Sequence, residues 1–159
     1  MKKINLYSFV VVLLLASTGY PLAQAAENSA GSGASVGGIP YKKDKRGLVF
    51  ADIKRGEQIF SKNCSVCHGV KAEGNPTWKI KGPDGKYTPP PLNGTGHAWH
   101  HQRSALLRTI MQGTKKIGGS MPPFAGKLSD SEADAVITWF TSLWPDKAYE
   151  IWSKGRPHH

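Results

Sequence analysis

Apolar residues recur at helical spacing in three segments, and the first of these begins near Phe50. It predicts a helix running to about Asn63, with Asp52 as a candidate N-cap. The apolar face of this helix contains Ile53, Gly56 and Phe60. Glycine inside a helix costs about 1 kcal/mol relative to alanine, so Gly56 indicates that another element approaches closely there.

Two further helices follow the same spacing. One spans Arg103 to Gln112, ends at Gly113, and carries an apolar stripe of Leu106, Leu107, Ile110 and Met111. The other begins at a capping box formed by Ser129 and Glu132 and ends at Pro145. Its broad apolar face consists of Ala133, Val136, Ile137, Trp139, Phe140 and Leu143.

The remaining segments show neither helical nor strand periodicity. Residues 69–100 contain five prolines, and a stretch this long inside a compact domain is unusual unless it wraps something. Residues 113–127 also read as a loop, and 146–159 as a polar tail from which Ile151 and Trp152 can pack back. We therefore expect a small all-α domain over 49–145, with about three to four helices and long loops.

The N-terminal residues indicate export. Lys2 and Lys3 precede an apolar run over residues 6–16, and small residues follow at Ala23 and Ala25. This pattern predicts a signal peptide over 1–25, cleaved after Ala25; an uncleaved membrane anchor is the alternative. Residues 26–48 are rich in Gly and Ser and then basic, and we expect a disordered linker there.

Composition and charge narrow the expected partners. Hydrophobic residues make up 39% of the chain, with 18 Gly and 11 Pro, so the core should be small and need a cofactor or crosslink. The formal charge is +10, and removal of residues 1–25, with two lysines and no acid, leaves +8. Such a surface favours acidic partners or anionic membrane surfaces, or is simply well solvated. An exported chain without a basic-aromatic motif is not expected to bind nucleic acid.

Both cysteines lie in one short motif, Cys64-Ser65-Val66-Cys67-His68. Four chemistries fit: covalent haem attachment, a thioredoxin-type dithiol, a zinc site and a structural disulfide. A thioredoxin-type dithiol normally lies in a βαβ unit, and this chain shows no strand pattern. A structural zinc site normally needs four ligands, and only one Cys-x-x-Cys pair is present. Haem attachment is favoured because a haem would also supply the apolar core that this loop-rich chain lacks.

A haem iron has two axial positions, and His68 would fill one of them. Met121, followed by two prolines, is the candidate for the other, because a thioether is a soft ligand that raises the potential. Met121 could instead only fill the core, which is the role expected for Met111.

With these motifs the chain resembles a mono-haem class I cytochrome c over about residues 50–145. In that family a glycine and an aromatic residue precede the first haem cysteine by eight and four positions, as Gly56 and Phe60 precede Cys64. The resemblance implies that this first helix crosses the last helix at right angles. It also implies that Trp139 is the matching aromatic residue.

The resemblance also implies roles for the segment Pro90-Pro91-Leu92. Pro90 would accept a hydrogen bond from the axial histidine, and Leu92 would lie against the haem. The chain departs from the family's short members in its N-terminal extension and in a cluster of His97, His100 and His101. This cluster could bind copper or another metal, contact the haem propionates, or form a polar loop, and we assign no second metal.

A closed haem site implies an electron carrier rather than an enzyme. We expect a periplasmic monomer that moves electrons from a quinol-oxidising complex or a dehydrogenase to an oxidase or reductase. Association with a membrane surface is a further option. A labile sixth iron site would instead bind or reduce peroxide or a gas. A dedicated dehydrogenase subunit would expose an apolar patch built from Trp99, Trp144 or Trp152, and a haem-free thiol oxidoreductase is the remaining alternative.

Overall fold

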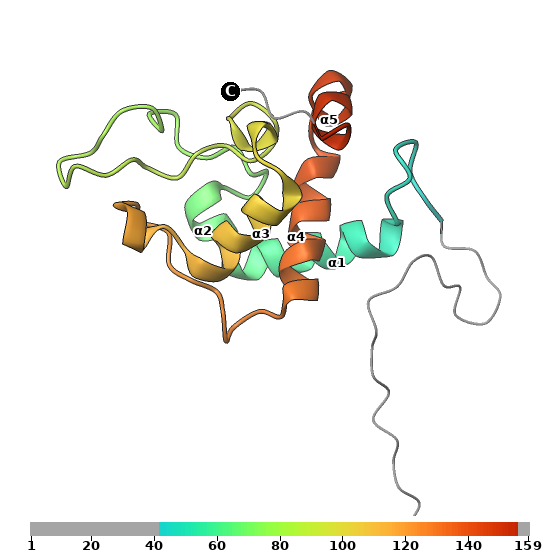
Figure 1. Cartoon of the computed structure of the whole chain (residues 1–159), viewed down its shortest axis with the longest axis horizontal. Helices are drawn as coiled ribbons and strands as arrows, with labels where there is room; N and C mark the ends of the chain where they lie inside the picture. Colours follow the sequence, from blue (N-terminus) through green and yellow to red (C-terminus); the bar gives the residue numbers. More distant parts are fainter. Residues whose placement is uncertain (1–41, 156–159) are drawn as a thin grey trace, which may run out of the picture. The chain divides into compact units, whose positions relative to one another are not determined.

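The computed structural model describes residues 42–155, and all of their regular elements are helices. The expected signal peptide, most of the linker and the histidines at 158 and 159 lie outside the described residues. Within 42–155 only isolated β-bridges occur and no strand, which confirms the all-α class. The elements, shown in Figure 1, are α1 (Phe50–Asn63), α2 (Ser65–His68), η2 (Ala98–His100), α3 (Arg103–Gln112), η3 (Lys115–Ile117), α4 (Asp130–Ser142) and α5 (Asp146–Ser153).

Helix α1 starts earlier than expected. Its N-cap is Val49, so the expectation that Asp52 caps it is wrong; Asp52 lies in the first turn. A bridge between Lys43 and Val49 and a 3.0 Å hydrogen bond from the Phe50 amide to the Lys42 carbonyl fix this start. A contact with the preceding segment, rather than a side-chain cap, therefore begins the helix.

Helices α1 and α4 cross and pack tightly against each other, as the resemblance to class I cytochromes c implies (Figure 1). A Cβ atom added to Gly56 would lie 1.9 Å from the Ala135 carbonyl oxygen, so only glycine allows this approach. Beside it, the rings of Phe60 and Trp139 have centroids 4.4 Å apart. The contact confirms the pairing of Phe60 with Trp139 that the resemblance implied.

Helix α4 contributes more residues to the buried core than any other helix in residues 42–155. Its capping box is present, with Glu132 accepting from the Ser129 amide and Ser129 accepting from the Glu132 amide. The apolar patch of tryptophans that would favour a dedicated dehydrogenase subunit does not form, because Trp144 is 1% exposed and Trp99 and Trp152 pack against the core. The buried hydrophobic residues are Phe60, Ala72, Ala98, Leu106, Ile110, Phe124, Leu128, Ala133, Val136, Ile137, Trp139, Phe140 and Trp144.

Two segments at the ends of the domain are packed on it. Residues 42–48, the end of the expected disordered linker, form a turn that contacts the end of α4 and belongs to the folded unit. Residues 146–153 of the expected tail form α5, which contacts η2. No helix between residues 42 and 155 is long and apolar enough to cross a membrane.

Candidate functional site

The two cysteines lie on one helical turn. Cys64 ends α1 and begins α2, and its carbonyl accepts from the Cys67 amide at 3.1 Å and from the His68 amide at 2.9 Å. Cys67 is exposed and Cys64 is half-buried. Burial, and then the neighbouring Cys67, raise the pKa of the Cys64 thiol to about 11. The turn thus presents two thiols and an imidazole from five consecutive residues.

His68 is buried and its ring is fixed by a backbone contact. Its Nδ1 atom lies 2.9 Å from the carbonyl oxygen of Pro90. A carbonyl oxygen only accepts hydrogen bonds, so Nδ1 carries the proton and the neutral ring has a free lone pair on Nε2. Burial lowers the pKa of His68 and the bond to Pro90 partly opposes this, so the imidazole is held neutral, as a metal ligand must be.

The segment that carries Pro90 is held from two sides. The Leu92 amide donates to the Ala72 carbonyl at 2.8 Å, and the Leu92 carbonyl accepts from the Trp144 indole at 2.7 Å. Leu92 itself is half-buried and packs against the core. The residue that accepts from His68 therefore lies in a fixed segment.

Met121 lies on the loop after α3 and is half-buried against the core. The Thr114 hydroxyl accepts from the Met121 amide at 3.1 Å, and the Met121 carbonyl accepts from the Thr114 amide at 3.0 Å. A Cβ atom on Gly113 would lie 2.6 Å from the Met121 carbonyl oxygen, so the loop closes tightly on the end of α3. Met111 also packs against the core, from α3 itself.

A cavity of about 430 Å³ borders the segment of Pro90. Its lining residues are Trp78, Lys79, Tyr87, Thr88, Pro90 and His97. Among residues 42–155, Thr88 has the one buried side-chain polar atom without a hydrogen-bond partner, its Oγ1. Buried hydroxyls are normally paired, so this atom can bond to a polar group placed next to it.

The three clustered histidines make ring contacts with one another or with neighbouring tryptophans. His97 stacks on Trp78 with centroids 5.4 Å apart, and meets His101 edge to face at the same distance. His100 stacks on Trp99 at 3.8 Å. No group of three or more His, Cys, Asp or Glu side chains in the described part of the chain is arranged to hold a metal ion.

The roles of two residues that support the site were not predicted from the sequence. Trp144 was considered only as part of an exposed patch, yet its indole holds the Leu92 carbonyl. Arg46 lay in a basic run without periodicity, yet it binds the Trp144 carbonyl at 2.6 Å. No local pattern signals either role, because both contacts join positions about 50 and 100 residues apart.

These residues fit a covalently attached haem. Two thiols on one turn can form thioethers, the Nε2 lone pair of His68 can bind iron, and a long irregular segment over residues 69–97 can enclose a flat apolar group. The unpaired Thr88 hydroxyl adds a donor for a polar edge of that group.

Comparisons with known proteins point to the same cofactor. A family described as cytochrome C oxidase, cbb3-type, subunit III matches residues 51–140. The chain is 32% identical over 111 residues to the cbb3-type cytochrome c oxidase subunit FixP of Bradyrhizobium diazoefficiens, covering 69% of this chain and 31% of that subunit. It is 34% identical over 114 residues to a thiosulfate dehydrogenase of Psychrobacter arcticus, covering 66% and 32% of the two chains.

A smaller relative is matched over nearly its whole length. The chain is 33% identical over 92 residues to cytochrome c6 of Bumilleriopsis filiformis, covering 58% of this chain and 92% of that one. By contrast, the chain spans about a third of the length of the FixP subunit and of the thiosulfate dehydrogenase. The family match covers more than half of the chain, so the chain belongs to this cytochrome c family: it is a mono-haem class I cytochrome c with one covalently attached haem c.

Proposed function

We propose that this protein is a periplasmic single-electron carrier whose iron is bound by His68 and Met121. Cys64 and Cys67 form the two thioethers, and Pro90 and Leu92 line the proximal side of the haem. The observation that carries the proposal is the 2.9 Å contact between His68 Nδ1 and the Pro90 carbonyl, since it leaves Nε2 free to bind iron. Haem c supplies a ferric–ferrous couple that accepts and releases one electron.

The residues around the site keep the iron's surroundings constant during that exchange. Pro90 holds the His68 ring in one tautomer and orientation, which limits rearrangement between oxidation states. Thr114 holds the backbone of Met121 at both its amide and its carbonyl. An iron bound by both His68 and Met121 would offer small molecules no open position.

The surface beside the thioether turn supports brief docking of acidic partners. Val66 is 88% exposed and Val70 is 72% exposed, on either side of the exposed Cys67, and Lys71 follows. Ile117 is 83% exposed next to two lysines in η3. Apolar side chains flanked by positive charge favour small, transient and electrostatically steered interfaces.

We propose a quinol-oxidising complex or a dehydrogenase as donor and an oxidase or reductase as acceptor. The similarity to a cbb3-type oxidase subunit supports an oxidase on the acceptor side. Export, inferred from residues 1–25, supports the periplasm as its location.

The test is ligand access to the iron. Cyanide is added to the oxidised protein and carbon monoxide to the reduced protein, and binding is followed by absorbance. An electron carrier closed by Met121 should bind both slowly and weakly. Rapid, tight binding would instead identify a labile sixth position, and with it a protein that binds or reduces peroxide or a gas.

A further inference from the structure

Arg46 projects from a tight turn formed by residues 43–49, which we call the N-terminal strap. Asp44 shapes this turn, because its carboxylate accepts from the amides of Arg46 and Leu48, each at 2.8 Å. Gly47 adopts φ +80°, which favours glycine at this position. The strap therefore holds Arg46 in a defined direction.

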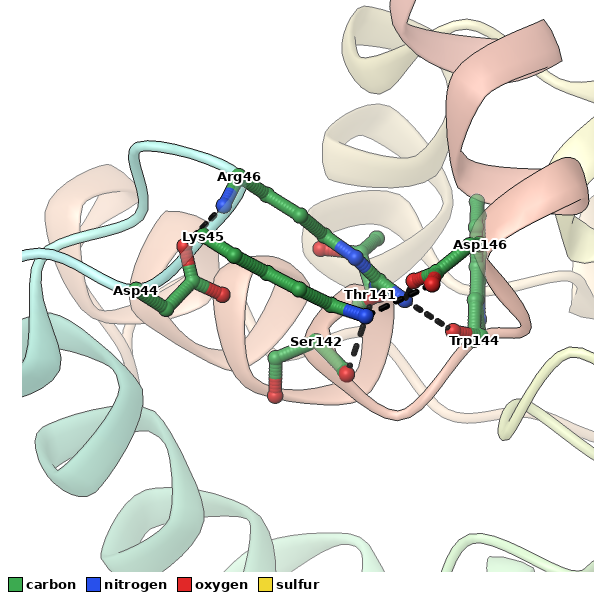
Figure 2. A network of polar contacts seen from close by, with 7 residues as sticks. All are labelled: Asp44, Lys45, Arg46, Thr141, Ser142, Trp144 and Asp146. Atoms are coloured by element: carbon green, nitrogen blue, oxygen red, sulfur yellow. Dashed lines mark hydrogen bonds and ion pairs between the residues drawn. The ribbon is translucent and has the colours of Figure 1, made fainter.

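The Arg46 side chain binds the junction between α4 and α5, as Figure 2 shows. It donates to the carbonyls of Trp144 at 2.6 Å, Thr141 at 3.2 Å and Ser142 at 3.4 Å. It also pairs with Asp146. Its guanidinium lies 4.7 Å from the ring centroid of Tyr149, and the side chain is 12% exposed.

Carbonyls at the end of a helix lack partners within that helix, and a planar guanidinium can satisfy several of them at once. The strap thus supplies a cap to α4 from a segment about 95 residues earlier in the chain. This explains why 42–48 is packed, although its composition favours a linker.

The junction that Arg46 holds is in direct contact with the His68 side of the site. Trp144, whose carbonyl binds Arg46, donates its indole N–H to the Leu92 carbonyl at 2.7 Å. Two residues further on, a Cβ atom on Gly94 would lie 2.6 Å from Pro145 and 3.1 Å from Trp144. The segment after Pro90 is therefore seated on this junction.

We propose that Arg46 is a positioning residue for the axial histidine. The contacts form a continuous chain: Arg46 holds Trp144, Trp144 holds Leu92, and Leu92 fixes the segment whose Pro90 carbonyl orients His68. The N-terminal strap thereby keeps the bond between His68 and Pro90 formed, and its loss loosens that bond. This inference rests on the proposed role of His68 as the iron ligand.

Lys45 offers a matched control for the test. It binds the same Asp146 carboxylate at 2.6 Å, but its side chain is 71% exposed, whereas Arg46 also reaches three carbonyls. Arg46→Gln and Lys45→Gln remove the same charge from neighbouring positions. Arg46→Lys keeps the charge and loses the planar fork.

The experiment measures hydrogen exchange in the full-length, haem-loaded protein by NMR of the reduced state. The probes are the Leu92 amide and the His68 ring N–H, with amides in the middle of α3 as the internal reference. We expect Arg46→Gln to speed exchange at both probes at least about tenfold relative to Lys45→Gln, with α3 unchanged. Arg46→Lys should lie between the two, and Trp144→Phe should reproduce the effect of Arg46→Gln.

The reduction potential gives a second readout that a local helix cap would not change. A carbonyl partner raises the basicity of a ligating histidine, which favours ferric iron. Loosening the hydrogen bond between His68 and the Pro90 carbonyl should therefore make the reduction potential of Arg46→Gln higher than that of Lys45→Gln.

Three results would overturn the proposal. Faster exchange confined to the Tyr149 amide, which is bonded to the Pro145 carbonyl, would make the strap only a cap of the junction. Equal acceleration in α3 would make Arg46 a contributor to global stability alone. An unchanged exchange rate for the His68 ring N–H in Trp144→Phe would break the chain at its middle. A protein without histidine-bound haem, seen first in its absorbance spectrum, would contradict the proposed function instead.

Discussion

The Nδ1 atom of His68 donates a 2.9 Å hydrogen bond to the carbonyl oxygen of Pro90, 22 residues further along the chain. This bond joins the turn that carries both cysteines to the segment anchored by Ala72 and Trp144. It selects the imidazole tautomer that can bind iron and fixes the ring's direction. The site's chemistry therefore depends on a contact between the helical turn of α2 and a distant loop rather than on one rigid element.

Replacing the sulfur of Met121 should change the redox properties. We predict that Met121→Leu lowers the reduction potential by roughly 100 mV or more, because a soft ligand that favours ferrous iron is lost. The measurement is a spectroelectrochemical titration. Met111→Leu is the matched control and should leave the reduction potential nearly unchanged, because Met111 lies in α3 and packs against the core. The reverse pattern would make Met111 the ligand.

Loss of both thiols should remove the cofactor and most of the fold. We predict that the double variant Cys64→Ala, Cys67→Ala retains no covalent haem on a denaturing gel and shows strongly reduced helical circular dichroism. The reason is that the buried core is small without a large apolar group in it. A stably folded, haem-free double variant would show that the core is self-sufficient.

The crossing of α1 and α4 should not tolerate a methyl group at Gly56. A Cβ atom there would lie 1.9 Å from the Ala135 carbonyl oxygen and 2.9 Å from the Trp139 Cβ. We predict that Gly56→Ala lowers the free energy of unfolding by about 1–3 kcal/mol or more, measured by denaturant titration. Gly82→Ala is the control, since its Cβ would meet first only the flexible Asp84 carboxylate at 3.2 Å. Similar stabilities for the two variants would mean that the helices cross less closely.

The capping box of α4 should make stability depend on pH. Hydrogen bonds from the backbone and side chain of Ser129 lower the pKa of Glu132. A carboxyl group with a lowered pKa stabilises the fold above its ordinary value, near pH 4, and loses this effect as the pH falls through the lowered one. We therefore predict that Glu132→Gln is less stable than the parent protein at pH 6, and that the difference shrinks toward pH 3. A difference that is constant with pH would point to packing instead.

Local patterns predicted the elements whose signals lie within a few residues. The capping box at Ser129 and the apolar periodicity after it identified α4, because both signals are local. The helix crossing at Gly56 was implied by the resemblance to class I cytochromes c, not by periodicity. Helix α5 was missed because Pro145 was read only as the end of α4, although it is also the N-cap of α5. A proline suits the start of a helix as well as it stops the preceding one.

Contacts between distant segments could not be read from the sequence. Val49 rather than Asp52 is the N-cap of α1, because Val49 forms a β-bridge with Lys43. Trp144 is buried because the loop after Pro90 folds over it, and its indole then finds the Leu92 carbonyl. Such pairings depend on how loops close, and no periodicity within either segment reports them.

The most direct test of the account is the absorbance spectrum of the exported protein, oxidised and reduced, including the weak near-infrared band of ferric haem bound to sulfur. Ligation of a covalently attached haem c by His68 and Met121 predicts a haem c spectrum, with that band present in the wild type and in Met111→Leu but absent in Met121→Leu. Covalent haem without the band in the wild type would contradict it, because the second axial ligand would then not be Met121 and the closed electron carrier would give way to a protein with an accessible iron.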